Sequence, residues 1–129
     1  MITSDIVIIG AGPAGLFAAI HCKNLKVIVL EKNSAPGKKL LISGTGRCNL
    51  THDCKLIDFF DHYGENHRFL KSALHYFTNT DLIRFFNDHG LETVVDKNGK
   101  VFPASQKAQD VLQVLVKVCS RNNVEIRCN

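Results

Sequence analysis

A glycine-rich hexamer near the start of the chain limits its fold more than any other feature. Gly10-Ala11-Gly12-Pro13-Ala14-Gly15 has the form G-x-G-x-x-G and directly follows the apolar, β-branched run Asp5–Ile9. Such a run is typical of a central parallel strand covered on both faces. The Ala-rich stretch Pro13–Lys23 predicts a helix, and Lys26–Leu30 predicts a second strand that closes in Glu31. Strand, tight turn, helix and strand within this short distance predict a right-handed βαβ unit.

The hexamer and Glu31 together have the spacing of a dinucleotide-binding fingerprint. In that fingerprint Gly10 allows the sharp turn, Gly12 lets a pyrophosphate approach the backbone, and Gly15 lets helix and strand pack closely. The N-terminus of the helix offers free N–H groups and partial positive charge to the pyrophosphate. Glu31 lies 21 residues after Gly10 and is predicted to accept hydrogen bonds from both hydroxyls of the adenosine ribose. Its negative charge disfavours a 2′-phosphate there.

The fingerprint alone does not distinguish NAD from FAD. Residues 32–55 are polar, basic and Gly-rich, and predict a loop with at most one short helical turn. Loops of this length are usually functional, and an NAD domain more often reaches its next helix sooner. Lys38 and Lys39 are predicted to pair with phosphates or to lie over the adenosine, although a solvated basic turn is the alternative. Ser43–Gly46 can present backbone N–H groups to an anion or to the edge of a flavin.

The remainder of the chain predicts helices, a hairpin and a final strand. Apolar residues at helical spacing predict helices around Phe69–Phe77 and Leu82–Phe86, the second capped by Asn79 or Thr80. Thr93–Phe102 predicts a hairpin in which Asn98-Gly99 supplies positive φ angles. A long helix from Ala108 to Cys119 and a strand from Val124 to Arg127 follow.

These elements predict an α/β, Rossmann-type FAD/NAD(P)-binding domain over residues 1–129. Residues 1–55 form the βαβ unit and the phosphate and flavin loop, residues 56–104 helices and the hairpin, and residues 105–129 a helix and a returning strand. The last strand ends at Asn129, where a ligand-binding loop normally follows the strand. We therefore expect a truncated domain.

Composition and charge exclude several other classes of protein. Sixteen Lys and Arg against twelve Asp and Glu are a mild basic excess, and the aromatic residues have the spacing of core positions, so nucleic acid is not an expected partner. No apolar run is long enough to span a membrane or to form a signal sequence, and five cysteines without a C-x-x-C pair favour reduced thiols, so we expect a cytoplasmic protein. The spacing of Cys48, His52, Cys54, His62 and His67 matches no common zinc site, and no metal is expected.

Four stretches of the sequence resemble the N-terminal part of the BaiN/YhiN-like, or aminoacetone-oxidase-like, flavoproteins. The stretches are Asp5–Gly15, Pro36–Thr51 with its Ser-Gly-Thr-Gly-Arg-Cys-Asn loop, Arg68–Leu74, and Gly99–Ser105 with Lys107-Ala108 and Asp110-Val111. The departures are Lys38, where the family often has Arg, and Thr45, where it often has Gly. The resemblance implies a two-dinucleotide-fold flavoprotein, considerably longer than this chain, that holds FAD non-covalently. It also implies that the C-terminal half and the substrate domain of such a flavoprotein are absent from these 129 residues.

The resemblance also implies roles for particular residues. Ala14 and the neighbouring glycines would contact the pyrophosphate, Glu31 the ribose, Lys38 and Lys39 the adenosine side, and Gly44 to Arg47, including Gly46, the flavin side. Arg47 would lie near flavin N1/O2 or pair with a phosphate, and Cys48 is expected to pack in the core. No catalytic residue is identified.

The functional hypothesis is the FAD-binding portion of a flavin-dependent oxidoreductase linked to NAD(P)H, in which either the reduced pyridine nucleotide or a small-molecule substrate delivers hydride to flavin N5 and the flavin passes the electrons to an acceptor. Two alternatives stay open: a non-catalytic nucleotide-binding fragment of a truncated or split gene, and an NAD-dependent dehydrogenase domain.

Overall fold

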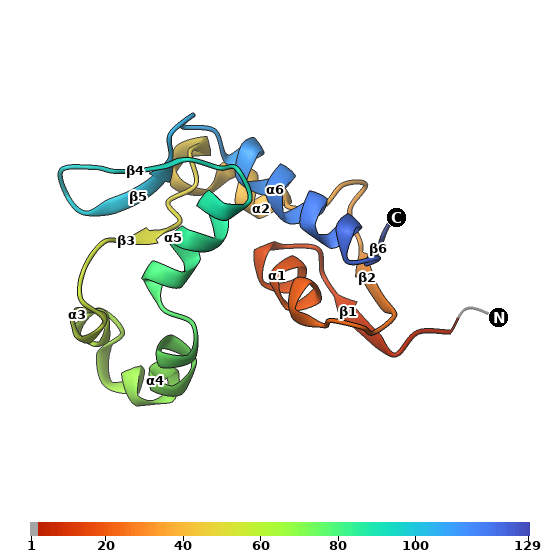
Figure 1. Ribbon diagram of the computed structural model, residues 1–129, viewed down its shortest axis with the longest axis horizontal. Coiled ribbons are helices and arrows are strands. Elements are labelled where there is room, and N and C mark those ends of the chain that lie inside the picture. The colour runs from red at the N-terminus through yellow and green to blue at the C-terminus, as the bar shows by residue number, and fades with distance from the viewer. Residues whose placement is uncertain (1–2) are drawn as a thin grey trace. The chain divides into compact units, whose positions relative to one another are not determined.

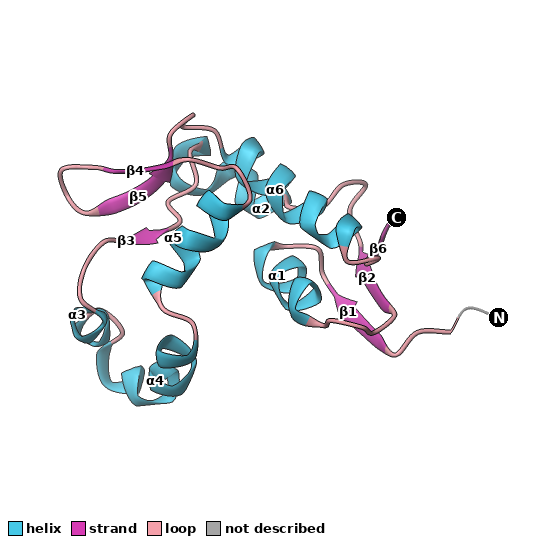
Figure 2. Cartoon of the chain, viewed as in Figure 1, coloured by secondary structure: helices cyan, strands magenta, loops and turns pink. Residues whose placement is uncertain are grey.

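A computed structural model describes residues 3–129 and divides them into two compact units. The first unit contains the described residues up to Cys48 together with Lys107–Asn129, and the second contains Asn49–Gln106. Figures 1 and 2 show that the first unit combines parallel strands with helices, whereas the second combines helices with a small antiparallel sheet. None of the helices in residues 3–129 is both long enough and apolar enough to cross a membrane.

The first unit is built on a three-stranded parallel sheet in the order β1-β2-β6. Ile6 lies opposite Val27 in the first pair of strands, and Ile28 lies opposite Glu125 in the second. The elements in chain order are β1 (Ile6–Ile9), α1 (Pro13–His21), β2 (Val27–Glu31), α2 (Lys38–Ile42), the 3₁₀ turn η1 (Ser43–Gly46), α6 (Ala108–Arg121) and β6 (Glu125–Cys128). The predicted βαβ unit and the Rossmann-type fold class are confirmed.

The core of the first unit lies between β2 and the helices α1 and α6, which pack against each other. Val27, Ile28 and Val29 of β2 are buried, whereas Val7 and Ile9 of β1 are 52% and 80% exposed. The sequence predicted that β1 is central and covered on both faces, and this was wrong for residues 3–129. In the observed strand order β2 is central, and β1 lies at one edge of the sheet, where its alternate side chains are exposed.

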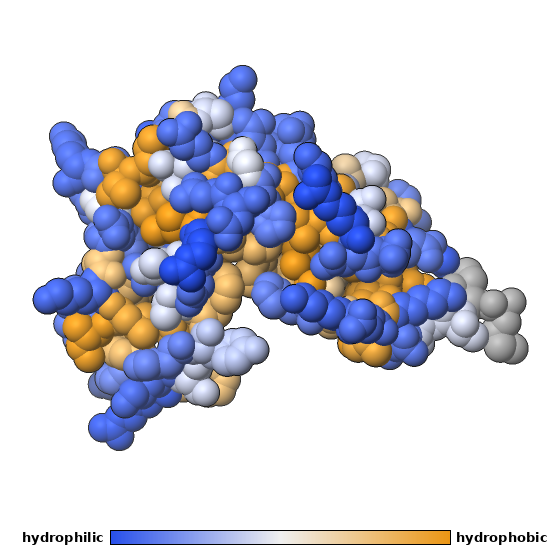
Figure 3. Space-filling model, in the orientation of Figure 1, coloured by the Kyte–Doolittle hydropathy of each residue, from blue (hydrophilic) through white to orange (hydrophobic). Residues whose placement is uncertain are grey.

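The second unit has a three-stranded antiparallel sheet in the order β3-β5-β4. Its elements are β3 (Thr51–His52), α3 (Leu56–Asp61), the 3₁₀ turn η2 (Gly64–Asn66), α4 (His67–Tyr76), α5 (Asn79–Asp88), β4 (Thr93–Val95) and β5 (Lys100–Pro103). Apolar surface is visible over α3 in Figure 3, where Ile57 is 65% exposed.

Residues 32–55 are more regular than the predicted loop with one short helical turn, because they contain α2, η1 and β3. Each of these elements is too short to produce a recognisable hydrophobic periodicity in the sequence.

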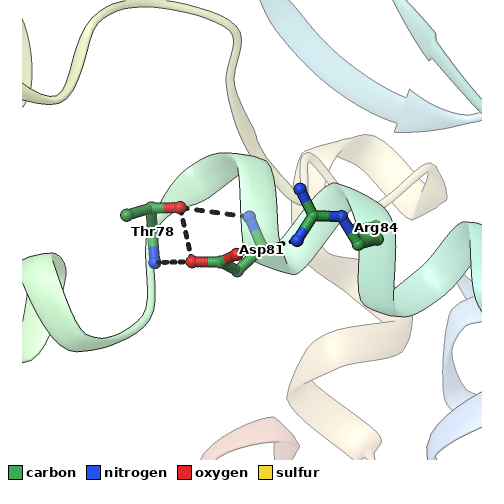
Figure 4. Close-up of polar contacts among 3 residues, drawn as sticks. All are labelled: Thr78, Asp81 and Arg84. Atoms are coloured by element: carbon green, nitrogen blue, oxygen red, sulfur yellow. Dashed lines mark hydrogen bonds and ion pairs between the residues drawn. The ribbon is translucent and has the colours of Figure 1, made fainter.

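Helix α5 begins with a reciprocal capping box, drawn in Figure 4. The backbone N–H of Asp81 donates to Thr78 Oγ1 at 3.1 Å, and the Thr78 N–H donates to Asp81 Oδ2 at 3.0 Å. The sequence predicted Asn79 or Thr80 as the cap, which was wrong by one or two positions. Asn79 is buried instead, and its Nδ2 donates to the carbonyls of His52 at 2.9 Å and Cys54 at 3.0 Å.

The predicted hairpin is confirmed, with a different turn. Val94 lies opposite Phe102 in the antiparallel pair β4 and β5. Gly99 has a φ of 80°, but Asn98 does not have a positive φ. Asp96 Oδ1 instead accepts the N–H groups of Asn98 at 2.8 Å and Lys100 at 2.9 Å, so an aspartate holds the turn and only the glycine needs left-handed backbone.

Candidate functional site

A pocket of about 440 Å³ lies at the carboxyl ends of β1 and β2. This volume is within the range of about 300–1,000 Å³ that is typical of small-molecule and cofactor sites, and the carboxyl edge of a parallel sheet is where such ligands bind. The pocket is lined by Ile9, Gly10, Gly12, Pro13, Ala14, Gly15, Leu30, Glu31, Lys32, Asn33, Gly37, Lys38 and Lys39.

The pocket brings together most of the residues that the sequence predicted for a binding site. Those in its lining are Gly10, Gly12, Ala14, Gly15, Glu31, Lys38 and Lys39. Gly44, Gly46 and Arg47 are exposed residues in or directly after η1 and do not line this pocket. The structure therefore gathers the fingerprint residues and the two lysines at one place, with the Gly44–Arg47 segment outside it.

The three glycines of the hexamer meet different steric conditions. Gly10 has a φ of 99°, and its N–H donates to the carbonyl of Leu30 at 2.7 Å, which ties the turn to the end of β2. Gly12 is the N-cap of α1 with an ordinary φ of −79°, and a Cβ added to it would meet nothing within 4 Å. A Cβ on Gly15 would collide with the carbonyl oxygen of Gly10. Gly15 is therefore required by the fold, whereas Gly12 leaves open space beside the backbone.

Glu31 joins the two loops that border the pocket. Its Oε2 accepts the backbone N–H of Ala11 at 2.8 Å, and its Oε1 accepts the backbone N–H of Asn33 at 2.9 Å and the Asn33 side-chain amide at 2.6 Å. The backbone hydrogen bonds from Asn33 and then Ala11 lower the pKa of this carboxyl below its ordinary value. The Glu31 side chain is thus an ionised acceptor held in place by donors from both loops.

Gly37 closes the same side of the pocket. Its N–H donates to the carbonyl oxygen of Ala11 at 2.8 Å, and its φ of 75° places it in left-handed backbone before α2. A Cβ at this position would lie 2.5 Å from Leu112 Cδ1 on α6. The sequence predicted no binding role for Gly37 or Asn33. The sequence did contain a signal for Gly37, which lies between Pro36 and the two lysines that begin α2. A glycine directly before a helix indicates a turn with positive φ, because glycine tolerates that conformation.

The segment after α2 has an unusual backbone. Gly44, Thr45 and Gly46 have φ angles of 53°, 58° and 81°, and Cys48 has a φ of 60°. Consecutive left-handed residues are uncommon, and for a β-branched residue such as Thr45 the conformation is strained. Cys48 is buried, and burial raises the pKa of its thiol, which favours the unreactive protonated form.

Within residues 3–129, no group of three or more His, Cys, Asp or Glu side chains is placed to hold a metal ion.

The model of one protein family, described as the HI0933-like protein Rossmann domain, matches residues 4–129. The chain belongs to this family. The HI0933-like family comprises the FAD-dependent oxidoreductases that the sequence resembles, so the resemblance based on the Ser-Gly-Thr-Gly-Arg-Cys-Asn loop and the fingerprint is confirmed.

Two curated relatives are similar over almost the whole HI0933-like chain. A ribosomal RNA dihydrouridine synthase of Escherichia coli (strain K12) is 35% identical over 125 residues, which cover 95% of this chain and 30% of the relative. A 3-dehydro-bile acid delta(4,6)-reductase of Clostridium scindens is 35% identical over 123 residues, which cover 92% of this chain and 29% of the relative. The chain thus spans less than a third of the length of these relatives.

Solved structures show the same fold at low sequence identity. THI4 of Thermovibrio ammonificans superimposes with a TM-score of 0.63 at 12% identity, covering 97% of this chain and 38% of that one. A 3-ketosteroid-delta4-(5alpha)-dehydrogenase of Rhodococcus jostii RHA1 superimposes with a TM-score of 0.60 at 14% identity, covering 97% of this chain and 37% of that one.

Proposed function

We propose that this chain is the FAD-binding Rossmann domain of a flavin-dependent oxidoreductase, and that its pocket takes the ADP half of FAD. The observation that carries the proposal is the pocket itself, in which Gly12 faces open space beside the N-terminus of α1 and Glu31 is held at the end of β2. An approaching pyrophosphate needs such space, and a ribose needs such an acceptor.

The charges around the pocket fit the same ligand. The nine-residue helix α1 directs its N-terminal N–H groups and partial positive charge to the end that carries Gly12 and Ala14. Lys38 and Lys39 line the pocket and would offset the two negative charges of the pyrophosphate, while the carboxylate of Glu31 would receive the ribose. We assign Gly44, Gly46 and Arg47 to the flavin end, because Gly44 and Gly46 lie in left-handed backbone within an exposed turn and the cationic Arg47 directly follows it, a combination that suits an anion or the edge of a flavin.

When bound, the flavin supplies two-electron chemistry as hydride transfer at N5. We propose NAD(P)H as the donor, oxidised to NAD(P)⁺. The names of the two relatives, a ribosomal RNA dihydrouridine synthase and a 3-dehydro-bile acid delta(4,6)-reductase, both describe reduction of a carbon–carbon double bond. For this chain we propose a small-molecule substrate with a double bond conjugated to a carbonyl, one carbon of which takes the hydride and the other a proton.

Flavin retention tests the proposal directly. The purified chain is mixed with FAD, separated from the excess, and examined by visible absorption and flavin fluorescence. Gly12→Val is the decisive variant, because its side chain enters open space and should leave the fold intact while blocking the pyrophosphate. Ala18→Val, at an exposed position of α1, is the matched control.

We expect the wild-type chain and Ala18→Val to retain flavin and Gly12→Val to lose it, with circular dichroism unchanged in all three. Tighter binding of NAD than of FAD would overturn the proposal in favour of a dehydrogenase domain. Equal flavin retention by Gly12→Val would show that the pocket is not the site.

We also propose a reducing, cytoplasmic location, because all five cysteines are free thiols. Fractionation of cells that express the chain tests this, and recovery from an oxidising compartment with cysteine pairs formed would contradict it.

A further inference from the structure

The carboxylate of Glu31 has nearly all of its acceptor capacity occupied before any ligand binds. A carboxylate offers about four lone-pair positions, two on each oxygen. Oε1 already accepts both the backbone N–H and the side-chain amide of Asn33, at 2.9 Å and 2.6 Å. Among residues 3–129, only the N–H of Ala11 donates to Oε2, at 2.8 Å. One acceptor position is left, and it is on Oε2.

The Asn33 donors are held in place by the surrounding backbone. The N–H of Asn129, which follows β6, donates to the carbonyl oxygens of Glu31 at 3.1 Å and Asn33 at 3.3 Å. This pair of contacts fixes the main chain at both residues, so the Asn33 N–H and side-chain amide start from a defined position beside Oε1. The two donors of Asn33 are therefore positioned to occupy both acceptor positions of Oε1. Little further conformational entropy is lost, because the loop is already ordered.

We propose that Asn33 determines how many ribose hydroxyls Glu31 can bind. The side-chain amide of Asn33 occupies Glu31 Oε1, so that Glu31 accepts a hydrogen bond from one ribose hydroxyl, through Oε2, and not from both. Asn33 is a positioning residue in this scheme, since it acts on the ligand through Glu31. The inference rests on the proposed function, because it assumes that the pocket takes an adenosine ribose. It differs from the contact with both hydroxyls that the sequence predicted.

Deoxynucleotides test the inference with the whole chain. Calorimetry measures the affinity of ADP, 2′-deoxy-ADP and 3′-deoxy-ADP for the wild type, for Asn33→Ala and for Ser34→Ala, an exposed neighbour outside the pocket lining. In the wild type and in Ser34→Ala, one deoxynucleotide should bind roughly tenfold more weakly than ADP, the effect of one hydrogen bond to a charged group, and the other should match ADP.

Asn33→Ala frees the second position on Oε1. Both deoxynucleotides should then bind more weakly than ADP, because both hydroxyls now reach the carboxylate. Equal losses for the two deoxynucleotides in the wild type would overturn the inference while leaving the proposed function intact. Absence of ADP binding by every variant would overturn the proposed function and the ribose contact with it.

A second measurement follows the Asn33–Glu31 contact without any ligand. A carboxyl ¹³C NMR titration should place the pKa of Glu31 higher in Asn33→Ala than in the wild type, because one donor to the ionised form is lost. Ser34→Ala should match the wild type. The same Glu31 titration curve in Asn33→Ala and in the wild type would show that the side-chain amide does not bind Oε1, and would overturn the inference.

Discussion

Gly15 lies so close to the carbonyl oxygen of Gly10 that a side chain cannot be inserted between them. This contact is where α1 packs against the end of β1, and it requires hydrogen at the Cα of Gly15. Gly12, three residues earlier, faces open space. The two glycines of one hexamer therefore have separable roles, Gly15 in the fold and Gly12 beside the pocket.

Gly15→Ala should lower the free energy of unfolding by about 3 kcal/mol, since its methyl group overlaps backbone that cannot move independently. Gly12→Ala should cost less than about 1 kcal/mol, through the weaker helix cap alone. Urea unfolding followed by circular dichroism measures both. A similar cost for the two variants would contradict this division of roles.

Thr45→Gly should stabilise the chain by about 0.5–1 kcal/mol. Thr45 has a φ of 58° and an exposed side chain, so glycine relieves backbone strain of about 1–2 kcal/mol and loses part of that gain to its greater freedom in the unfolded chain. Thr45→Ala, which keeps the Cβ, should gain less. Thermal unfolding of the three proteins tests this, and a lower melting temperature for Thr45→Gly would refute the assignment of strain.

Thr78→Ala should destabilise the chain by about 1 kcal/mol, because it removes the oxygen that caps α5 (Figure 4). Hydrogen bonds from Thr78 lower the pKa of Asp81 below its ordinary value of 3.8. The stability that the Asp81 carboxylate contributes is therefore present above about pH 4 and is lost as the pH falls through its lowered pKa. Asp81→Asn should be less stable than the wild type at pH 7, and the difference should shrink toward pH 2.

The thiol of Cys119 should make the chain less stable in alkali. Burial raises the pKa of Cys119 from 9.0 to about 11, so between these pH values the unfolded chain releases its proton while the folded chain retains it. The free energy of unfolding should therefore fall as the pH rises from 9 to 11. Cys119→Ala should be less stable at every pH but should show a shallower decline over this interval. Parallel curves for the two proteins from pH 6 to 11 would count against a buried titrating thiol.

The sequence determined the βαβ unit and indicated seven of the residues that line the pocket at its end. A β-branched run, the glycine hexamer, an apolar helix and an acidic residue at the end of the second strand are local signals with fixed spacing. The long helix α6 and the hairpin were likewise predictable, because the apolar stripe from Ala108 to Cys119 and the turn glycine Gly99 act within a few residues of the chain.

Other features were ambiguous even though they are local. Thr78, Asn79 and Thr80 are all residue types that cap helices, and only the packing of Asn79 against the carbonyls of His52 and Cys54 leaves Thr78 as the cap. Helix α2 has five residues, too few for periodicity to be recognised.

Only the tertiary structure decided what surrounds Glu31 and which strand is central. The partners of Glu31 come from Ala11, 20 residues away in the chain, and from a loop that Asn129 fixes. The exposure of β1 follows from the strand order β1-β2-β6. These contacts join residues that are distant in the sequence. They depend on how the helical crossovers place the strands side by side, which no short-range sequence pattern specifies.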